Sequence, residues 1–365
     1  MLYRVIGMMS GSSLDGLDMA FIEFEENRGK WNFEIIAAQC KPYNSEWMQK
    51  LQNATSLSAY DYLLLHAAYG KYTGEQVNDF IKEFDLHHKV QLIASHGHTT
   101  FHAPAMGMTA QLGDGAAIAA ATEINVVSDL RAMDMAFGGQ GAPIVPAGEK
   151  LLFSDYSFCL NLGGIANISF KSNNDYVAFD VCPANRVMNL VAATEGKEYD
   201  EGGSMAASGK VYVPLLTRLN ALSYYSLPHP KSLANDFGTD IVFPLVQAFD
   251  LSNADKLRTY AEHILIQVIS AIQRLLLNND LKDAKLLITG GGAFNTFLVQ
   301  RLMQGLQALS IEVIVPDAAI INYKEALIMG LIGVLRWREE YNVLQSVTGA
   351  RRSSIGGAVW IGQEA

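Results

Sequence analysis

The residues with the clearest potential for chemistry form a turn of glycine, serine and aspartate near the N-terminus. The run Ser10-Gly11-Ser12-Ser13-Leu14-Asp15-Gly16 separates two apolar segments, residues 3–6 and 20–22, which predicts strand, turn and strand. Glycines let backbone N–H groups approach an anion, serine hydroxyls can donate, and Asp15 or Asp18 could hold a divalent cation. This composition is typical of a phosphate site, but it also occurs in ordinary hairpins.

A single aspartate in the second half of the chain is a candidate catalytic base. Asp180 follows a predicted strand, residues 176–179, and precedes Pro183 and a predicted helix, residues 185–194. A carboxylate at the carboxyl end of a strand can act as a base or hold a metal. It can equally cap the following helix, and the sequence leaves both interpretations open.

Two more glycine turns follow predicted strands. Gly163-Gly164 lies between the predicted strands 158–162 and 165–170, while Gly290-Gly291-Gly292 joins a strand at 285–289 to a helix at 296–309. A strand, a glycine turn and a helix can bring backbone close to a nucleotide. The spacing is not GxGxxG, so a dinucleotide is not specifically indicated.

Three histidines follow the predicted strand 90–94. His96, His98 and His102 lie in residues 95–102, which we expect to form a polar loop where α/β sheets usually bind ligands. An alternative is the transition-metal site of a hydrolase, which would need three or more converging ligands. Metal analysis of the purified protein separates these interpretations.

The remaining elements must position these turns. We expect a strand at 31–40, helices at 46–53, 59–71, 74–84 and 115–122, a strand at 124–127, a helix at 253–278, a strand at 312–315, a helix at 323–338 and a loop-like tail from 346. Residues 128–146 have no regular pattern and suggest a hinge or a cleft wall. The strand-turn-strand opening recurs at residue 158, which suggests a duplicated α/β unit.

Length and composition predict a folded protein of two domains. A chain of 365 residues exceeds the usual size of a single core, and we place the domains at 1–130, joined by the C-terminal tail, and 131–365. The net charge of −10 argues against binding to nucleic acid or an anionic membrane. Three scattered cysteines and an N-terminus without a signal-peptide pattern favour the cytoplasm.

Taken together, the motifs resemble those of the anhydro-N-acetylmuramic acid kinases, members of the actin, hexokinase and heat-shock ATPase superfamily. The resemblance covers nearly the whole chain. It is carried by residues 7–18, 95–99, 111–114, 129–131, 138–143, 161–164, 179–180, Pro183, Asn185 and 290–295.

The resemblance implies two ribonuclease-H-like (actin-like ATPase) domains with a central nucleotide cleft that takes ATP and Mg²⁺. The family opens the 1,6-anhydro bridge of anhydro-N-acetylmuramic acid with water and phosphorylates the freed O6, and the product enters cell-wall recycling. The sequence does not distinguish a monomer from a homodimer.

The resemblance also assigns roles to residues of this chain. Asp180 matches the general base, and Asp15 matches a metal ligand. Thr99, His98, Arg131 and Glu325 are expected to contact the amino sugar. The residues expected to bind ATP are Gly11, Ser12, Ser13, Leu14, Asp15, Gly16, Leu17, Asp18, Gly163, Gly164, Gly290, Gly291, Gly292 and Asn295.

A second alternative keeps this fold without its catalysis. The chain departs from the family pattern at Phe101, Val181, Cys182, Ala184 and residues 233–236. A nucleotide- and sugar-binding protein would tolerate such changes, because fold alone does not fix function. Formation of a 6-phosphorylated sugar from ATP distinguishes the enzyme from the binding protein.

Overall fold

The computed structural model describes residues 1–11, 14–172, 175–234, 236–277, 279, 281 and 283–363. These residues form two compact units, one of residues 1–154 and 323–365 and the other of residues 155–322. The units differ from the predicted limits 1–130 and 131–365, since residues 131–154 and the chain from Tyr323 belong to the first unit. The second unit is therefore inserted into the first along the chain.

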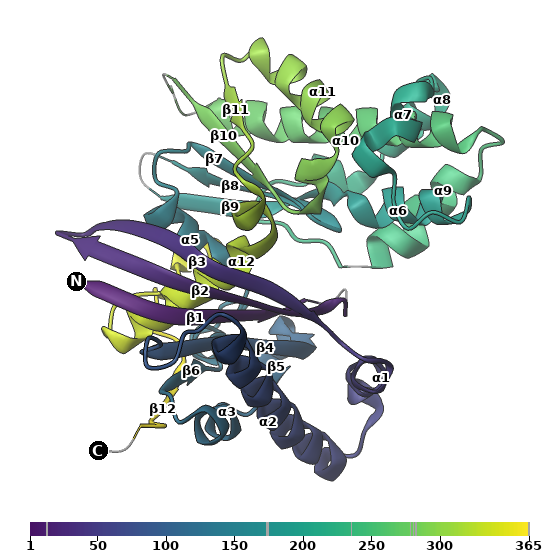
Figure 1. The fold of residues 1–365 in the computed structure, drawn as a ribbon. Coiled ribbons are helices and arrows are strands. Elements are labelled where there is room, and N and C mark those ends of the chain that lie inside the picture. The colour runs from purple at the N-terminus through teal and green to yellow at the C-terminus, as the bar shows by residue number, and fades with distance from the viewer. Residues whose placement is uncertain are drawn as a thin grey trace. The chain divides into compact units, whose positions relative to one another are not determined.

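The first unit is built on a twisted sheet (Figure 1). Its strands are β1 (Leu2–Ser10), β2 (Gly16–Asn27), β3 (Lys30–Pro42), β4 (Leu92–Ala103), β5 (Met108–Leu112), β6 (Val126–Ser128) and β12 (Ala358–Trp360). Its helices are α1 (Ser45–Gln52), α2 (Ala59–Glu83), α3 (Gly115–Thr122), α4 (Ala132–Ala136), α5 (Val145–Leu152), α13 (Gln345–Thr348) and most of α12 (Ala318–Trp337).

The second unit repeats this plan. Its strands are β7 (Phe158–Leu162), β8 (Ile165–Lys171), β9 (Tyr176–Pro183), β10 (Lys285–Thr289) and β11 (Glu312–Ile314). Its helices are α6 (Asn185–Ala193), α7 (Ser204–Ser208), α8 (Val213–Asn220), α9 (Phe243–Gln247), α10 (Asn253–Leu276) and α11 (Thr296–Gln307).

The two sheets have the same topology. The first has the order β12-β6-β4-β1-β2-β3 with β5 beside β4, and the second has the order β11-β10-β7-β8-β9. In each, three antiparallel strands are followed by a fourth strand parallel to the first, β4 beside β1 and β10 beside β7. The prediction of an α/β fold with two ribonuclease-H-like halves is confirmed.

The faces of the first sheet are covered by different helices because side chains alternate along β1. Ile6 and Met8 are buried in a core formed with α2 and α3. Gly7 faces α12, where an added Cβ would overlap the carbonyl oxygen of Ala326. Glycine at this position therefore lets the helix backbone lie directly on the strand.

Helix α2 is continuous, although the sequence predicted two helices, 59–71 and 74–84. The Thr73 hydroxyl donates to the carbonyl of Tyr69 within α2 over 2.8 Å. A Cβ on Gly74 would lie 2.7 Å from the Cβ of Ala121 in α3. The glycine is a close contact between helices rather than a helix boundary.

Strand β4 extends through the segment that was predicted to be a polar loop. Residues 98–103 pair with β5, and His98 lies opposite Leu112. The polar side chains fit into the sheet because other side chains satisfy them, as the next subsection describes.

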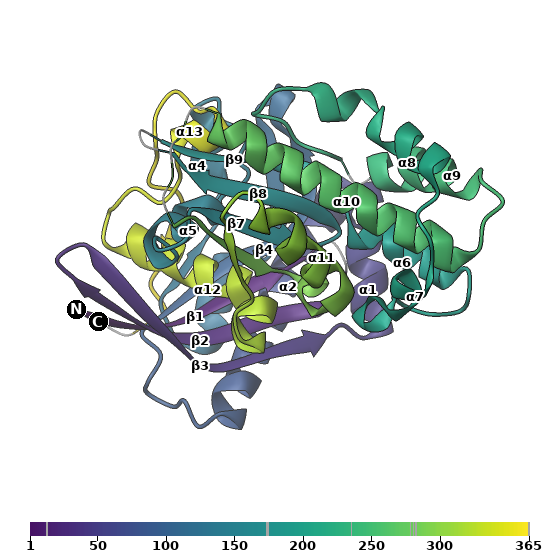
Figure 2. The ribbon, with the colours of Figure 1, turned by 90° about the horizontal axis from the view of Figure 1, so that it is seen from above.

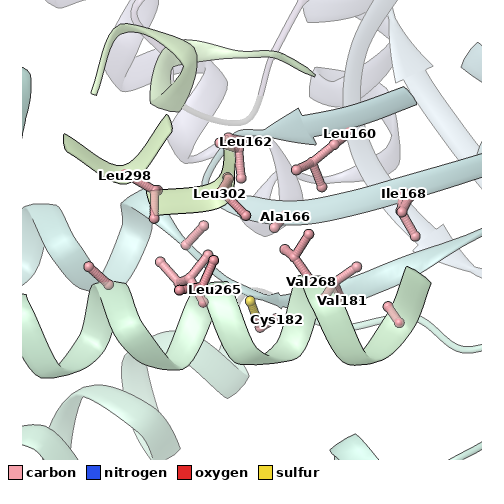
Figure 3. Packing of buried hydrophobic residues seen from close by; sticks show 14 of the residues in the cluster. Leu160, Leu162, Ala166, Ile168, Val181, Cys182, Leu265, Val268, Leu298 and Leu302 are labelled. Atoms are coloured by element: carbon pink, nitrogen blue, oxygen red, sulfur yellow. The ribbon is translucent and has the colours of Figure 1, made fainter. Parts of the chain in front are cut away.

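The core of the second unit forms between its sheet and α10, confirming that this helix is a core element. Figure 2 shows α10 running along the sheet, and Figure 3 shows Leu265 and Val268 of α10 on the side of the helix that faces the sheet, in one cluster with Leu162 and Val181. This packing fixes the side of β9 that carries Phe179 and Val181.

The C-terminal segment completes the first unit instead of forming a loose tail. Strand β12 pairs antiparallel with β6, and the Thr348 hydroxyl in α13 donates to the buried carboxylate of Asp134. Within the described residues one helix, α12, is long and apolar enough to span a membrane. Its apolar stretch is 67% buried within the protein, as expected of a core helix.

Candidate functional site

The β1–β2 turn carries the first set of predicted ATP-binding residues. Ser12 and Ser13 lie outside the described residues. The N–H of Gly16 donates to the Asp15 carboxylate over 3.0 Å. A Cβ on Gly16 would meet the Cys40 sulfur and the Lys41 carbonyl oxygen at 2.6 Å, so β3 alone requires glycine there.

The other residues of this turn divide into backbone and side-chain candidates. Leu17 is buried in the apolar core and Leu14 packs against it, so only their backbone groups can face a ligand. Gly11 lies directly after β1, where its carbonyl accepts the N–H of Leu14. Asp15 and Asp18 are the acidic side chains at this end of the sheet.

A group of acidic side chains lies where β2 approaches α12. Burial raises the pKa of Asp18 to about 6, a hydrogen bond from Cys40 opposes this, and the charges of Asp15 and Glu325 add to it. Burial also raises the pKa of Glu325. The charges of three predicted ligand residues therefore influence one another at this end of the sheet.

Arg131 is held beside this acidic group. Its Nε donates to Nε2 of His96 over 2.8 Å, and Nδ1 of the same ring lies 2.9 Å from the Gly97 carbonyl oxygen. The carbonyl can only accept, so Nδ1 carries the proton and Nε2 accepts from Arg131. Burial lowers the pKa of His96 to about 3, which keeps the ring neutral.

The charge of Arg131 is stabilised by Glu325. Burial lowers the pKa of the guanidinium to about 10, and Glu325 acts in the opposite direction. The structure thus brings together two of the four predicted sugar contacts, which the sequence separates widely.

His98 ends a chain of buried hydroxyl groups. The Tyr43 hydroxyl donates to the Ser10 hydroxyl over 2.8 Å, and the Ser10 hydroxyl oxygen lies 2.9 Å from Nδ1 of His98. Burial lowers the pKa of His98 to about 4, so the ring is neutral. Its Nε2 is the ring nitrogen left for a substrate. Nearby, the Thr99 hydroxyl accepts from Gln111 over 3.4 Å.

The histidines do not form a metal site. His96 contacts Arg131, His98 contacts Ser10, and Nδ1 of His102 lies 3.2 Å from the Thr109 hydroxyl. Within the described ranges, no group of three or more His, Cys, Asp or Glu side chains could hold a metal ion. The proposed transition-metal alternative finds no support here.

The second unit contributes its own glycine turn between β7 and β8. The carbonyl of Gly163 accepts the N–H of Asn185, and that of Gly164 accepts the N–H groups of Ala184 and Arg186. These bonds tie the turn to the start of α6. The nearest atoms to an added Cβ on Gly163 are 3.5 Å away, so packing does not require this glycine.

The triple-glycine turn lies against the end of β7. Gly290 has a φ of +78°, and a Cβ on Gly292 would lie 2.6 Å from the Cβ of Leu162. Gly291 has open space, with only the Asn185 amide nitrogen at 3.7 Å from its added Cβ. The structure therefore brings the second and third glycine turns together within one unit.

Asn295, which is predicted to contact ATP, also caps helix α11. Its side-chain oxygen accepts the N–H of Leu298 over 3.0 Å and caps α11. Only the amide nitrogen of this side chain is left for a nucleotide.

Asp180 lies in β9 with its backbone and one carboxylate oxygen fixed. The N–H of Leu233 donates to Oδ2 over 2.8 Å, the Tyr224 hydroxyl donates to the Asp180 carbonyl over 2.6 Å, and the Asp180 N–H donates to the Lys231 carbonyl. No hydrogen bond to Oδ1 occurs among the described residues. Burial raises the pKa of the carboxyl to about 6.

This geometry removes one alternative for Asp180. The residue before α6 is Ala184, which makes no side-chain cap, and the Asp180 carboxylate bonds to Leu233 instead of that helix. The helix-cap interpretation is therefore wrong. A half-buried carboxylate with one restrained oxygen and a pKa near neutrality is suited to general-base catalysis.

Sequence reasoning missed the residues that support the site. His96 was noted only as a candidate metal ligand, and Tyr43, Tyr224 and Leu233 had no assigned role. Of these residues, only the tyrosines offer a sequence clue to a supporting role, because a buried tyrosine hydroxyl needs a hydrogen-bond partner. Asp134 accepts the Gly141 N–H over 2.8 Å and holds its loop.

Comparison with known proteins agrees with the motifs. A family model described as anhydro-N-acetylmuramic acid kinase matches residues 3–362. A relative of that name from Hydrogenovibrio crunogenus is 33% identical, with 97% of each chain covered. Another from Synechococcus elongatus is 32% identical over 98% of this chain and 99% of the relative.

Among solved structures, an activator of the 2-hydroxyisocaproyl-CoA dehydratase from Clostridium difficile with bound ADPNP has a TM-score of 0.44 and 15% identity. The alignment with this structure covers 92% of this chain and 96% of the activator chain. The assignment depends instead on the family model and the sequence relatives, which match over almost the full length. This chain belongs to the anhydro-N-acetylmuramic acid kinase family.

Proposed function

We propose that this protein is an ATP-dependent sugar kinase that hydrolyses the 1,6-anhydro bridge of anhydro-N-acetylmuramic acid and phosphorylates O6. The product would be N-acetylmuramic acid 6-phosphate, an intermediate of cell-wall recycling. The observation that carries this proposal, beside the family match, is the Asp180 carboxyl. It is fixed by Leu233 through one oxygen and has a pKa of about 6.

In this proposal Asp180 takes a proton from the water that attacks the anomeric carbon. The bond from that carbon to O6 then breaks, and O6 attacks the γ-phosphorus while the bond to ADP breaks. Catalysis of phosphoryl transfer depends mainly on positioning and charge neutralisation. The glycine turns at 11–16 and 163–164 would supply backbone donors to the phosphates, and Gly290–Gly292 would lie at the adenosine.

Mg²⁺ fits the acidic group of the first unit. Asp15 and Asp18 offer the oxygen ligands that this ion prefers, and a cation would offset the charge of Asp15, which adds to the effect of burial in raising the pKa of Asp18. Mg²⁺ commonly uses one or two carboxylates together with phosphate oxygens and water. We propose Asp15 as a direct ligand.

Arg131 is our proposed contact for the lactyl carboxylate of the sugar, with Thr99, His98 and Glu325 on the hydroxyl and amide groups. Its Nε is bonded to His96, which leaves both terminal nitrogens for a two-point contact. Arg131→Gln should raise KM for the sugar about 10- to 100-fold, the range for a lost charged hydrogen bond. KM for ATP should stay nearly constant in steady-state assays.

A modified substrate and a control variant sharpen this experiment. Arg131→Gln should cost little with 1,6-anhydro-N-acetylglucosamine, which lacks the lactyl group, and the exposed Arg28→Gln should behave as wild type. An equal loss with both sugars would assign Arg131 to folding or to another contact.

The pH dependence of the reaction should report the base. The raised pKa means that Asp180 is protonated and inactive below about pH 6, so kcat/KM for the sugar should fall about tenfold per pH unit there. Asp18 has a similar pKa, so the profile is also measured in Asp18→Asn. A profile that flattens in that variant would assign the titration to Asp18.

The direct test is incubation with ATP, Mg²⁺ and the anhydro-sugar, followed by mass spectrometry of the products. We expect a 6-phosphorylated sugar carrying one oxygen from ¹⁸O-labelled water, and no comparable product from glucose. ATP binding without product, under conditions in which a known family member turns over, would favour the non-catalytic alternative.

We further propose that the protein acts in the cytoplasm, without nucleic acid or membrane partners, on ATP and a small amino sugar. The acidic net charge of −10 supports this, because it disfavours polyanionic partners. Homodimerisation is testable by light scattering.

A further inference from the structure

A cavity of about 210 Å³ lies in the second unit, between β9, α10 and the segment 225–231. Phe179 and Val181 form its floor on the strand side, and Ala271 contributes from α10. Its lining is mostly apolar, and Leu227 and His229 lie at its exposed rim. None of the residues assigned above to ATP or the sugar lines it.

Two cationic side chains, Lys231 and Arg274, line this apolar cavity. Lys231 Nζ donates to the Tyr224 carbonyl over 3.2 Å, and Arg274 Nη1 donates to the Tyr225 carbonyl over 2.9 Å. Neither makes an ion pair with a carboxylate of the described residues. Burial and the charge of Arg274 both lower the pKa of Lys231, so an anion between them would relieve a repulsion.

The shape of the cavity limits the rest of the ligand. A cavity of about 150 Å³ is known to hold benzene, so this one has room for a single ring with a short charged substituent. Its wall already accepts a flat ring, since His229 stacks on Phe179 with centroids 5.5 Å apart and planes 12° apart.

The cavity and Asp180 share their supporting backbone. Phe179 and Val181 line the cavity, while Asp180 between them lies opposite Asn167 in the sheet. The segment that closes the cavity also holds Asp180, through the Lys231 carbonyl and the Leu233 N–H. A ligand that fixes this segment therefore fixes the position of the carboxylate.

We propose that this cavity is a regulatory site for a single-ring carboxylate, whose anion lies between Lys231 and Arg274 and whose ring lies in the apolar part lined by Val181 and Ala271. Binding stabilises the segment that holds Asp180 and raises kcat. The increase in kcat depends on the function proposed above, whereas binding itself does not.

The test is calorimetric titration of the full chain with phenylacetate, beside 2-phenylethanol, which lacks the charge, and acetate, which lacks the ring. We expect phenylacetate to bind at least about tenfold more tightly than either, as one charged contact would give. Phenylacetate should also raise kcat for the anhydro-sugar about twofold or more, a difference of about 0.4 kcal/mol in the barrier.

Three variants locate the site. Ala271→Leu fills the cavity and Arg274→Gln removes one cation, so each should weaken binding about tenfold or more, with folding checked by thermal unfolding. Arg218→Gln, which removes an arginine stacked on Phe249 outside the cavity, should bind as wild type.

Several results would overturn the proposal. They are absence of phenylacetate binding, binding unaffected by Ala271→Leu and Arg274→Gln, displacement of phenylacetate by the anhydro-sugar, and binding without any change in kcat of an active enzyme. If the enzyme shows no kinase activity, the titration still decides whether the site exists, so failure of the two proposals is distinguishable.

Discussion

Asp180→Asn is expected to lower the rate of sugar phosphorylation by about 10²- to 10⁴-fold, the usual contribution of a general base. Asparagine is nearly isosteric and its side-chain oxygen can still accept the N–H of Leu233, so the fold should be retained. It cannot accept the proton of the attacking water. The rate falls because of this single chemical change.

The measurement combines product formation with equilibrium binding of an ATP analogue, which should change little. Asp250→Asn, the same substitution at an exposed aspartate of the same unit, should have wild-type activity. Retention of full turnover by Asp180→Asn would remove Asp180 from the role of base. Loss of nucleotide binding together with activity would point to a collapsed site.

Lys324→Met is expected to destabilise the first unit by about 3–5 kcal/mol, the range for breaking a buried ion pair. Lys324 Nζ lies 2.8 Å from Glu149 Oε1, and the two side chains are only 4% and 5% exposed. The substitution keeps the apolar stem but leaves a buried carboxylate without this cation. A double variant with Glu149→Leu should recover much of the loss, since it removes that charge.

Urea unfolding followed by tryptophan fluorescence is suited to this prediction. All four tryptophans, Trp31, Trp47, Trp337 and Trp360, belong to the first unit, so the signal reports on that unit alone. Lys50→Met breaks the exposed pair with Glu46 and should cost less than about 0.5 kcal/mol. Similar losses in the two variants would show that burial of the pair contributes nothing.

The strands were the most predictable part of the fold. The apolar segments at 158–162 and 285–289 became β7 and β10 with the same limits, and α10 followed its apolar spacing closely. These elements are buried on at least one face, so hydrophobic pattern and structure agree. The recurrence of strand, turn and strand indicated the duplicated topology for the same reason.

Other elements depend on contacts that local sequence does not contain. Gly74 resembles a helix boundary until α3 is seen to pack on it, and residues 98–103 resemble a loop until β5 pairs with them. The tail from residue 346 has too few apolar residues to predict β12, which forms because β6 offers an edge.

In the candidate site, too, the local features could be predicted from the sequence and the long-range contacts could not. Its glycines and Asp180 stand out in the sequence, because turn chemistry is local. The pairing of Arg131 with His96 and the restraint of Asp180 by Leu233 arise only from folding, across 35 and 53 positions of chain. Tautomers and pKa shifts, which depend on burial, could not be predicted before the structure.

The insertion of residues 155–322 within the first unit has a consequence for biosynthesis. Residues 1–154 leave the ribosome first, yet β6 must wait for β12 and β1 must wait for α12, both of which are made after the strands of the inserted unit. The inserted unit has all of its own strands by residue 314 and can fold while its host is still being translated. Until residues 318–337 have been made, the nascent N-terminal sheet exposes the apolar surface that α12 later covers.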